Sequence, residues 1–592
     1  MKKGILIILF IVFIFILLIS KSSLFENEEN KKINELLSSL STREKITQMI
    51  MPSLRFWGKE TNATGVTKLN DELTDLLNKN SFAGIILFSN NIVNEKQTVE
   101  LIDSIKTSNK KANSKIDLFI GVDQEGGNVS RIKYNTQTIG NMGIGATNNS
   151  SYAKQTANLI SNELKALGFN LNFAPVLDIN NNPNNSVIGT RSFSDNPYVV
   201  SEFGKEYIKG LHDNKIISVV KHFMGHGDTS VDSHTSLPLI NKSYDELYKN
   251  ELIPFMNVID DTDMIMMAHI QYPLVDDTKY LSEKTGETLT LPASLSKKIV
   301  NDTLRKKIKY NGVIISDAMD MDAIRKHFTS LESTKLAIDA GVDIILMPFD
   351  ISTTEEIKHL NDYIDTITNM VDNNIISIKR IDESVKRILK LKNRYGLLSE
   401  NDDITKSINI DYEKNKEKSF DISLKSITLL KNNNKILPIS NDKKVIILYA
   451  DNSQKSMIET AINDLNINTN ILLKKYTDFD VNSFDSKDID IIIGISNYSN
   501  ISKANKNLFD KLINSDIDFV LLSSDLPYDV SMFHDSDAIV VCYNLNGIPA
   551  GIYTIYGKNN PDGKLPLNIP KLSSNLKFTN DLLYTREYGL EY

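Results

Sequence analysis

Short apolar runs alternate with longer helical patterns between about residues 50 and 347. Eight runs are typical of buried strands: Ile50–Met51, Gly84–Phe88, Leu118–Val122, Leu171–Phe173 continuing to Val176, Ile217–Val220, Met264–Ala268, Val313–Ile315 and Asp343–Met347. Helical patterns lie between them, at Ser151–Leu167, Ser243–Ile259, Ser294–Lys307 and Ile324–Ala340. Strands that alternate with helices pair in parallel, because each helix crosses back over the sheet. Eight such units favour a closed (β/α)8 TIM-like barrel over an open sheet.

A second α/β domain is expected after the barrel. The segment from Glu400 to Lys418 is charged and has no clear apolar strand, so it is interpreted as a linker. The strands expected after it are Val445–Tyr449, Ile489–Ile495, Phe519–Leu522 and Ala538–Tyr543. We therefore divide the α/β chain into a barrel over 31–400, a linker over 401–420 and a C-terminal α/β (αβα) sandwich over 421–592.

The first thirty residues have the pattern of an export signal. Lys2 and Lys3 precede an apolar run, Ile5–Ile19, and small and charged residues follow it. This order of charged, apolar and small residues is typical of a signal peptide, and an uncleaved membrane anchor is the alternative. Either one predicts that residues 1–30 are not part of the fold and that the rest of the chain is exported, as a secreted or anchored protein on the cell-wall face.

Composition narrows the classes of partner and cofactor. The formal net charge of −8 argues against a nucleic-acid-binding protein. Cys542 is the single cysteine, which excludes an intramolecular disulfide and a cysteine-based metal site. Neither domain has the glycine fingerprint of a dinucleotide or phosphate loop. We expect a monomer without metal or cofactor.

Polar residues follow four of the expected strands directly. Asp123 follows 118–122, Lys221 and His222 follow 217–220, His269 follows 264–268, and Asp317 follows 313–316. All lie at the carboxyl ends of strands, the functional face of a (β/α) barrel. Buried charge costs several kcal/mol unless it is paired or used, so the pattern predicts a site. For Asp123 and Lys221, as for Arg191, a mutual ion-pair network is the alternative interpretation.

The loop over 221–234 carries three of the eight histidines. Gly225 and Gly227 prevent a helix through it. An aspartate two residues from a histidine on a loop can accept the ring N–H and fix its tautomer, as general acid–base chemistry requires, so Asp232 and His234 are a candidate pair. A metal site is the less favoured alternative, because the glycines remove the helical spacing that paired histidine ligands use. Its ligands would be His222, His226, Asp228 and His234.

Several motifs in the same order resemble those of one enzyme family. Lys-His-Phe-Met-Gly-His-Gly-Asp-Thr-Ser-Val-Asp-Ser-His, at 221–234, closely resembles the signature of bacterial β-N-acetylhexosaminidases of glycoside hydrolase family 3. The segments that share this resemblance are 121–127, 173–180, 188–193, 312–321, 426–431, 437–438 and 560–566. The resemblance covers nearly all of the chain after residue 40 and is strongest to the two-domain Gram-positive form.

The resemblance implies a retaining hydrolase that releases N-acetylglucosamine from peptidoglycan fragments, or muropeptides. Asp317 would match the nucleophile, and His234 the acid/base, paired with Asp232. The residues that would hold the terminal sugar are Asp123, Arg131, Arg191, Lys221 and His222. Two departures are visible: Met224 stands where proline is usual, and Asn128 where arginine is frequent. Asn128 puts in question the contacts near Arg131.

Three other functions remain open at this point. A β-glucosidase of the same family would take its acid/base from a glutamate elsewhere, so Asp232 and His234 favour the hexosaminidase. A glycoside phosphorylase would use phosphate instead of water. A non-catalytic cell-wall sugar-binding protein would have no need of both Asp317 and His234.

Overall fold

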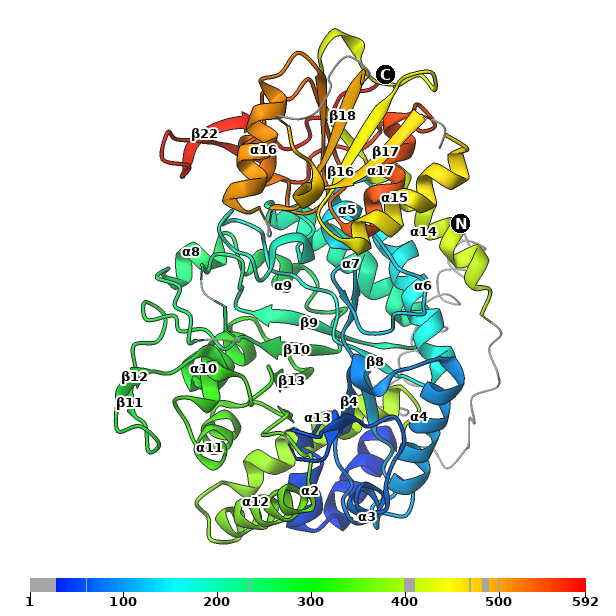
Figure 1. Ribbon diagram of the computed structural model, residues 1–592. Coiled ribbons are helices and arrows are strands. Elements are labelled where there is room, and N and C mark those ends of the chain that lie inside the picture. Colours follow the sequence, from blue (N-terminus) through cyan, green and yellow to red (C-terminus); the bar gives the residue numbers. More distant parts are fainter. Residues whose placement is uncertain are drawn as a thin grey trace, which may run out of the picture.

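The computed structural model describes residues 28–59, 61–230, 232–233, 236–398, 410–467, 470–481, 489–498 and 501–592. Figure 1 shows two domains, a barrel below and a layered α/β domain above it. The export signal or anchor expected at 1–30 lies outside the described residues as far as residue 27. Among the helices that are described, none has the length and apolarity needed to cross a membrane.

The first domain is a parallel barrel. Its strands are β1 (Ile50–Met51), β4 (Gly84–Leu87), β5 (Phe119–Val122), β8 (Leu171–Asn172), β9 (Ile217–Phe223), β10 (Met264–Met267), β13 (Val313–Ser316) and β14 (Ile345–Leu346). A parallel sheet runs from β4 to β13 in sequence order, and β1 pairs in parallel with β14. Single parallel bridges, Ser53–Ile86 and Ile315–Ile344, close the ring. The barrel expected from the apolar runs is confirmed.

Helices surround the barrel because each has one apolar face. Leu101, Ile102 and Ile105, for example, are buried on the inner face of one helix. The main barrel helices are α2 (Thr42–Thr47), α3 (Asp71–Lys79), α4 (Glu95–Asn109), α5 (Asn141–Ala146), α6 (Ser151–Leu167), α7 (Pro197–Asp213), α12 (Thr354–Asp372) and α13 (Ile378–Arg394). Antiparallel hairpins project from this frame, and they are β2 (Phe56–Trp57) with β3 (Thr64–Gly65), β6 (Gln124–Gly126) with β7 (Val129–Ser130), and β11 (Lys279–Leu281) with β12 (Thr288–Thr290).

Three of the expected helices are interrupted. The pattern at 243–259 forms α8 (Tyr244–Tyr248) and α9 (Ile253–Asn257), because Pro254 lacks the N–H that a continuous helix needs and instead occupies the first turn of a new one. The pattern at 324–340 forms α10 (Asp322–Arg325) and α11 (Ser330–Ala340), since Thr329 and Glu332 make a capping box that starts a helix. The third, at 294–307, is a 3-10 turn (Ala293–Leu295) followed by a π-helix (Lys298–Lys307).

The second domain has a six-stranded sheet between two helical layers. Its strand order is β15 (Thr428–Asn432), β20 (Ala538–Val541), β19 (Asp518–Ser523), β18 (Ile491–Ser496), β16 (Val445–Tyr449) and β17 (Ile471–Lys475), with only the β15–β20 pair antiparallel among these. The helices α15 (Asn452–Leu465) and α17 (Ile548–Ile555) pack on one apolar face, and α16 (Lys503–Ile513) packs on the other. The hairpin β21 (Ile569–Leu572) with β22 (Phe578–Tyr584) follows. The expected sandwich is confirmed.

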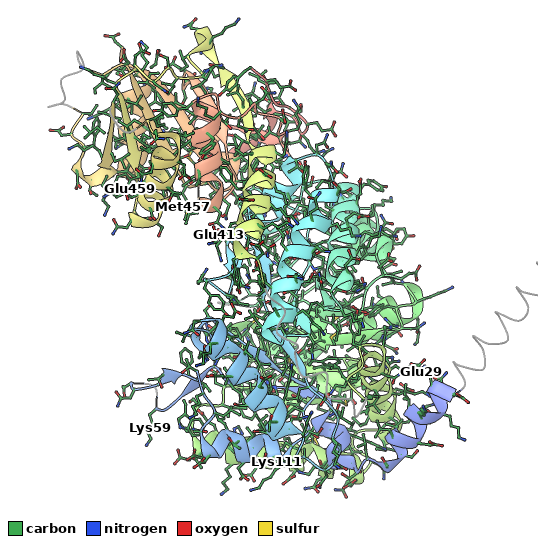
Figure 2. All side chains as sticks on the ribbon, turned by 90° about the vertical axis from the view of Figure 1, so that its right-hand side faces the viewer. Glu29, Lys59, Lys111, Glu413, Met457 and Glu459 are labelled. Atoms are coloured by element: carbon green, nitrogen blue, oxygen red, sulfur yellow. The ribbon has the colours of Figure 1, made fainter. Side chains whose placement is uncertain are left out.

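The expected linker is partly helical. Helix α14 (Tyr412–Ser426) begins inside it, with Asp411 capping the backbone N–H of Lys414. Figure 2 shows Glu413, on this helix, at the junction of the two domains. Ser419 Oγ donates to the carbonyl of Gln137 at 2.8 Å, which ties the helix to the barrel. Its sequence is so highly charged that no apolar periodicity marks it.

We expect Asp529 to make the stability of the second domain depend on pH. Its side chain is buried, and the Ser496 and Ser523 hydroxyls donate to it. Burial raises the pKa of Asp529 to about 7. The folded state therefore binds one more proton than the unfolded chain between about pH 4 and pH 7, so the free energy of unfolding falls as pH rises through that window.

We expect Asp529→Asn to mimic the protonated acid and to remove this penalty. The variant should gain about 4 kcal/mol over the wild type at pH 8 and little at pH 4. Urea unfolding of both proteins at the two pH values measures the difference. Glu459→Gln, on a partly exposed ion pair of the same domain, is the control and should change neither value. An equal difference between Asp529→Asn and wild type at both pH values would contradict the assignment.

Candidate active site

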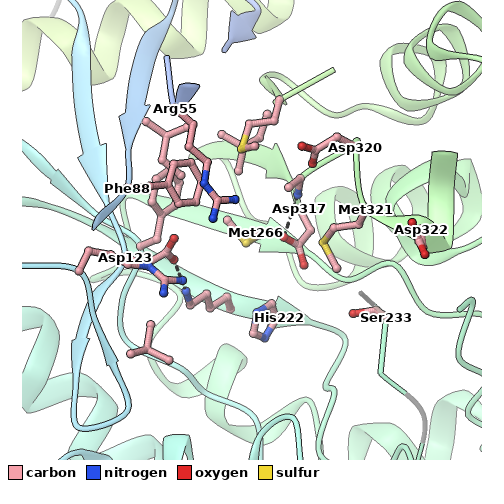
Figure 3. Close-up of a pocket in the computed structure, with 18 of the residues that line it drawn as sticks. Arg55, Phe88, Asp123, His222, Ser233, Met266, Asp317, Asp320, Met321 and Asp322 are labelled. Atoms are coloured by element: carbon pink, nitrogen blue, oxygen red, sulfur yellow. Dashed lines mark hydrogen bonds and ion pairs between the residues drawn. The ribbon is translucent and has the colours of Figure 1, made fainter. Parts of the chain in front are cut away.

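A cavity of about 770 Å³ opens at the carboxyl ends of the barrel strands. Six of the residues expected at the site line it: Asp123, Arg131, Arg191, Lys221, His222 and Asp317. Figure 3 shows Asp123 and His222 on one side of this cavity and Asp317 across from them. Residues from 123 to 317 thus meet in one place because parallel strands bring their carboxyl ends together.

A cluster of ion pairs forms one wall of the cavity, and Glu125 is at its centre. Lys221 Nζ lies 2.8 Å from Asp123 Oδ1 and 2.7 Å from Glu125 Oε1. Arg191 binds Glu125 through two nitrogens, with Nε 2.9 Å from Oε2 and Nη2 2.8 Å from Oε1. We call these four residues, Asp123, Glu125, Arg191 and Lys221, the ionic grip. The ion-pair network that was the alternative interpretation of the sequence does exist, and it lines the same cavity.

The charges of the ionic grip stabilise one another. Burial alone would raise the pKa of Glu125, but Arg191 and Lys221 hold it far below its usual value. Burial would likewise lower the pKa of Lys221, yet Asp123 and Glu125 raise it above its usual value. Both groups are therefore ionised at neutral pH. The wall presents fixed N–H donors and a carboxylate, a combination suited to the hydroxyl groups of a sugar.

Glu125 was not singled out from the sequence. It lies three residues beyond the end of β5, in the β6–β7 hairpin, where Gly126 and Gly127 both have positive φ. That turn, which non-glycine residues enter at a cost, belongs to the hairpin that places Glu125 at the cavity wall. Gln124 Oε1 accepts the backbone N–H of Arg131 at 2.8 Å, so the same hairpin also holds Arg131 at the cavity. The run of polar residues before two glycines was the available signal.

His222 is paired with Asp178. Asp178 was not among the polar residues that directly follow an expected strand. His222 Nδ1 lies 2.6 Å from Asp178 Oδ2, and the backbone N–H of His226 donates to Asp178 Oδ1 at 2.7 Å. Burial would raise the pKa of Asp178, but His222 lowers it below its usual value. An ionised Asp178 accepts a hydrogen bond from Nδ1–H of His222, which leaves Nε2 as the remaining polar atom of the ring.

The described members of the alternative metal set have other partners. The ring nitrogens of His226 lie 3.1 Å from Ser233 Oγ and 3.1 Å from Thr229 Oγ1, and burial lowers the pKa of His226 to about 4. Asp228 pairs with Lys242 at 2.9 Å. Within the described part of the chain, no group of three or more His, Cys, Asp or Glu side chains could hold a metal ion.

Asp317 follows β13 and lines the cavity. Its backbone N–H donates to the carbonyl of Met267 at 3.1 Å, and its Oδ1 accepts the N–H of Ala318 at 2.8 Å, so the carboxylate is fixed in direction (Figure 3). His269, also at a strand end, is buried beneath this loop. Its Nε2 lies 3.0 Å from the Ala318 carbonyl and its Nδ1 2.8 Å from Ser294 Oγ, so it supports the loop.

Asp232 belongs to a loop that contacts α10, the helix that follows Asp317. The neighbouring Ser233 lines the cavity, and its carbonyl accepts the N–H of Ala323 at 3.3 Å. His234 lies outside the described residues. The pairing of Asp232 with His234 therefore stays a prediction.

Other side chains complete the cavity and were not expected from the sequence. Arg55 lies 4.9 Å from the ring centroid of Phe88 and donates through Nε to Asn90. Burial and the nearby Asp350 raise the pKa of Asp320 to about 7.

A barrel whose mouth holds a fixed carboxylate opposite a cluster of hydrogen-bonding ions is typical of a glycoside hydrolase.

Comparison with known proteins supports this class. The model "Glycosyl hydrolase family 3 N terminal domain" matches residues 41–391, and "Glycosyl hydrolase family 3 C-terminal domain" matches residues 427–592. The chain belongs to glycosyl hydrolase family 3 and is a glycoside hydrolase, as the sequence motifs implied.

Relatives and a solved structure are consistent with this family assignment. The chain is 36% identical to β-hexosaminidase A of Pseudoalteromonas piscicida, over 70% of this chain and 71% of the relative. It is 34% identical to a β-hexosaminidase of Haemophilus influenzae, over 47% and 76% respectively. A family 3 β-N-acetylglucosaminidase from Paenibacillus sp. superposes with a TM-score of 0.76 at 28% identity, covering 89% of this chain and 99% of that one.

Proposed function

We propose that this hydrolase is a retaining exo-β-N-acetylglucosaminidase that acts on muropeptides through a covalent glycosyl–Asp317 intermediate. The observation that carries the proposal is the position of Asp317 across one cavity from the ionic grip. The names of the relatives, β-hexosaminidase and β-N-acetylglucosaminidase, support the choice of sugar. We further propose that it works as a monomer outside the cytoplasm, secreted or held by its N-terminal apolar segment.

In the first step, the ionic grip and His222 bind the hydroxyl groups of the terminal sugar. Asp317 attacks the anomeric carbon, and the bond from that carbon to the leaving oxygen breaks. His234, as imidazolium, donates its proton to this oxygen. Asp232 holds the ring in one tautomer and stabilises its charged form.

In the second step, neutral His234 accepts a proton from water while the water oxygen attacks the anomeric carbon. The bond to Asp317 breaks, and free N-acetylglucosamine leaves with retained configuration. An imidazole with a reference pKa near 6.5 can serve both steps at neutral pH. Because the imidazole is neutral after donating its proton, the acid/base places no additional negative charge beside the glycosyl–Asp317 ester.

The choice between sugars is tested with two aryl substrates. We expect kcat/KM for 4-nitrophenyl β-N-acetylglucosaminide to exceed that for the β-glucoside by at least about 100-fold, because a site built for an acetamido group leaves its partners unsatisfied when glucose binds. Product analysis with and without inorganic phosphate separates hydrolysis from phosphorolysis. Equal rates on both sugars would favour the glucosidase, a sugar phosphate the phosphorylase, and binding without turnover the sugar-binding protein.

A further inference from the structure

The C-terminal domain contacts the barrel beside the cavity, through the loop that follows β20. Asn544 in this loop is 3% exposed, and its Nδ2 donates to Asn128 Oδ1 at 2.6 Å. Asn128, on the exposed turn of the β6–β7 hairpin, in turn donates through Nδ2 to Thr190 Oγ1 at 3.2 Å. We call the three side chains, Asn544, Asn128 and Thr190, the amide relay. It crosses from the second domain into the barrel.

The hydrogen bonds themselves determine the direction of the relay. Asn544 Oδ1 accepts the backbone N–H of Asn546 at 2.9 Å, so only Nδ2 of Asn544 faces the barrel. Asn128 must then present its oxygen to Asn544, and its own N–H group is left for Thr190. Each amide therefore has one orientation that satisfies its neighbours.

The relay joins the two segments that carry the central pair of the ionic grip. Asn128 lies three residues after Glu125 on the hairpin, and Thr190 directly precedes Arg191 in the 3-10 turn Gly189–Arg191. The Glu125–Arg191 pair is bidentate, so a small displacement of either segment breaks one of its two hydrogen bonds. The relay therefore acts on the geometry of the grip.

The C-terminal domain also supports these segments at other points. A Cβ on Gly127 would lie 2.9 Å from Gly140 Cα, so the hairpin turn packs directly against the start of α5. Asn141, the first residue of α5, donates to the carbonyl of Arg191 at 2.7 Å. Met142 and Ala146 of the same helix belong to the apolar core of the C-terminal domain. The segments that carry Glu125 and Arg191 therefore both contact α5, which is itself packed into the C-terminal domain.

We propose that the C-terminal domain positions the ionic grip through the amide relay, with Asn544 and Asn128 as positioning residues. The inference rests on the proposed function of the cavity. Because Asp317 lies on a different part of the barrel, loss of the relay weakens sugar binding and leaves the chemical step largely intact.

Kinetics of alanine variants test the relay. Asn544→Ala and Asn128→Ala should each raise KM for 4-nitrophenyl β-N-acetylglucosaminide, and Ki for free N-acetylglucosamine, by about 5- to 20-fold, with kcat within about threefold of wild type. The double variant should be no worse than the more affected single variant, since both remove one connection. Asn415→Ala is the matched control. It removes a 2.9 Å hydrogen bond from α14 to Glu163 and should leave KM unchanged.

Hydrogen–deuterium exchange of the ligand-free proteins gives a readout that does not depend on catalysis. Backbone amides over 124–130 should exchange faster in Asn544→Ala than in wild type or Asn415→Ala. If wild type cleaves neither sugar, the proposed function fails and this measurement still decides the relay. Additive effects in the double variant, or a lower melting temperature with unchanged KM and unchanged exchange over 124–130, would overturn the relay.

Discussion

Asp317→Asn should abolish almost all turnover while leaving the fold intact. The amide has the shape of the carboxylate but no negative charge, so it cannot form the glycosyl ester on which a retaining mechanism depends. We expect kcat/KM for 4-nitrophenyl β-N-acetylglucosaminide to fall by about 10⁴-fold or more, with the melting temperature close to that of wild type. Stopped assays at high enzyme concentration measure the residual rate.

A mechanism-based label identifies the nucleophile directly. Incubation of wild type with a 2-acetamido-5-fluoro glycosyl donor should add one sugar to the protein, and peptide mapping should place it on Asp317. Asp320→Asn is the control, because Asp320 lines the same cavity three residues away and has no role in the proposed chemistry. The assignment is wrong if the label is found on Asp320 or Asp123, or if Asp320→Asn loses as much activity as Asp317→Asn.

The barrel could be predicted because its strands are buried on both faces. Runs such as 264–268 and 313–315 are continuously apolar, and their order along the chain is the order around the ring. The same regularity predicts that Asp123, Lys221 and Asp317 meet at one end of the barrel, and all three line the cavity there. Position at a strand end is a local property, so local sequence is sufficient to predict it.

Glu125 and Asp178 were missed because their roles depend on contacts between distant segments. Glu125 acquires its partners from residues 66 and 96 positions further along the chain, Arg191 and Lys221. Asp178 becomes the partner of His222 only when the loop after β8 folds against β9. No periodicity encodes such pairings.

In the C-terminal domain, too, features set by local sequence could be predicted, and contacts between distant segments could not. The strand β16 was predicted at its observed bounds. The edge strand β17 was not predicted, because its apolar run is only three residues long and its side chains are at most partly buried. Asn544 and Asn128 are 416 positions apart in the sequence, so their hydrogen bond between the two domains can be recognised only in the three-dimensional structure. Local sequence therefore leaves the role of this domain open.

Substrates with different leaving groups test whether His234 is the acid/base. His234→Ala should slow cleavage of a natural disaccharide far more than cleavage of a nitrophenyl substrate, because a sugar alkoxide needs protonation and nitrophenolate needs little. We expect a loss of about 10³-fold or more on the disaccharide and a much smaller loss of glycosylation rate on the aryl substrate. With the aryl substrate, hydrolysis of the intermediate becomes limiting, so added azide should restore turnover and yield the glycosyl azide.

Asp232→Ala should show the same pattern more mildly, because the imidazole remains but is no longer held in one tautomer. His222 provides the decisive comparison, since it also pairs with an aspartate and lines the cavity with Asp317. As a sugar-binding residue, His222→Ala should raise KM for both substrates alike and show no azide effect. If azide instead restores His222→Ala and not His234→Ala, the proton is transferred by the His222–Asp178 pair, and His234 has a binding or structural role.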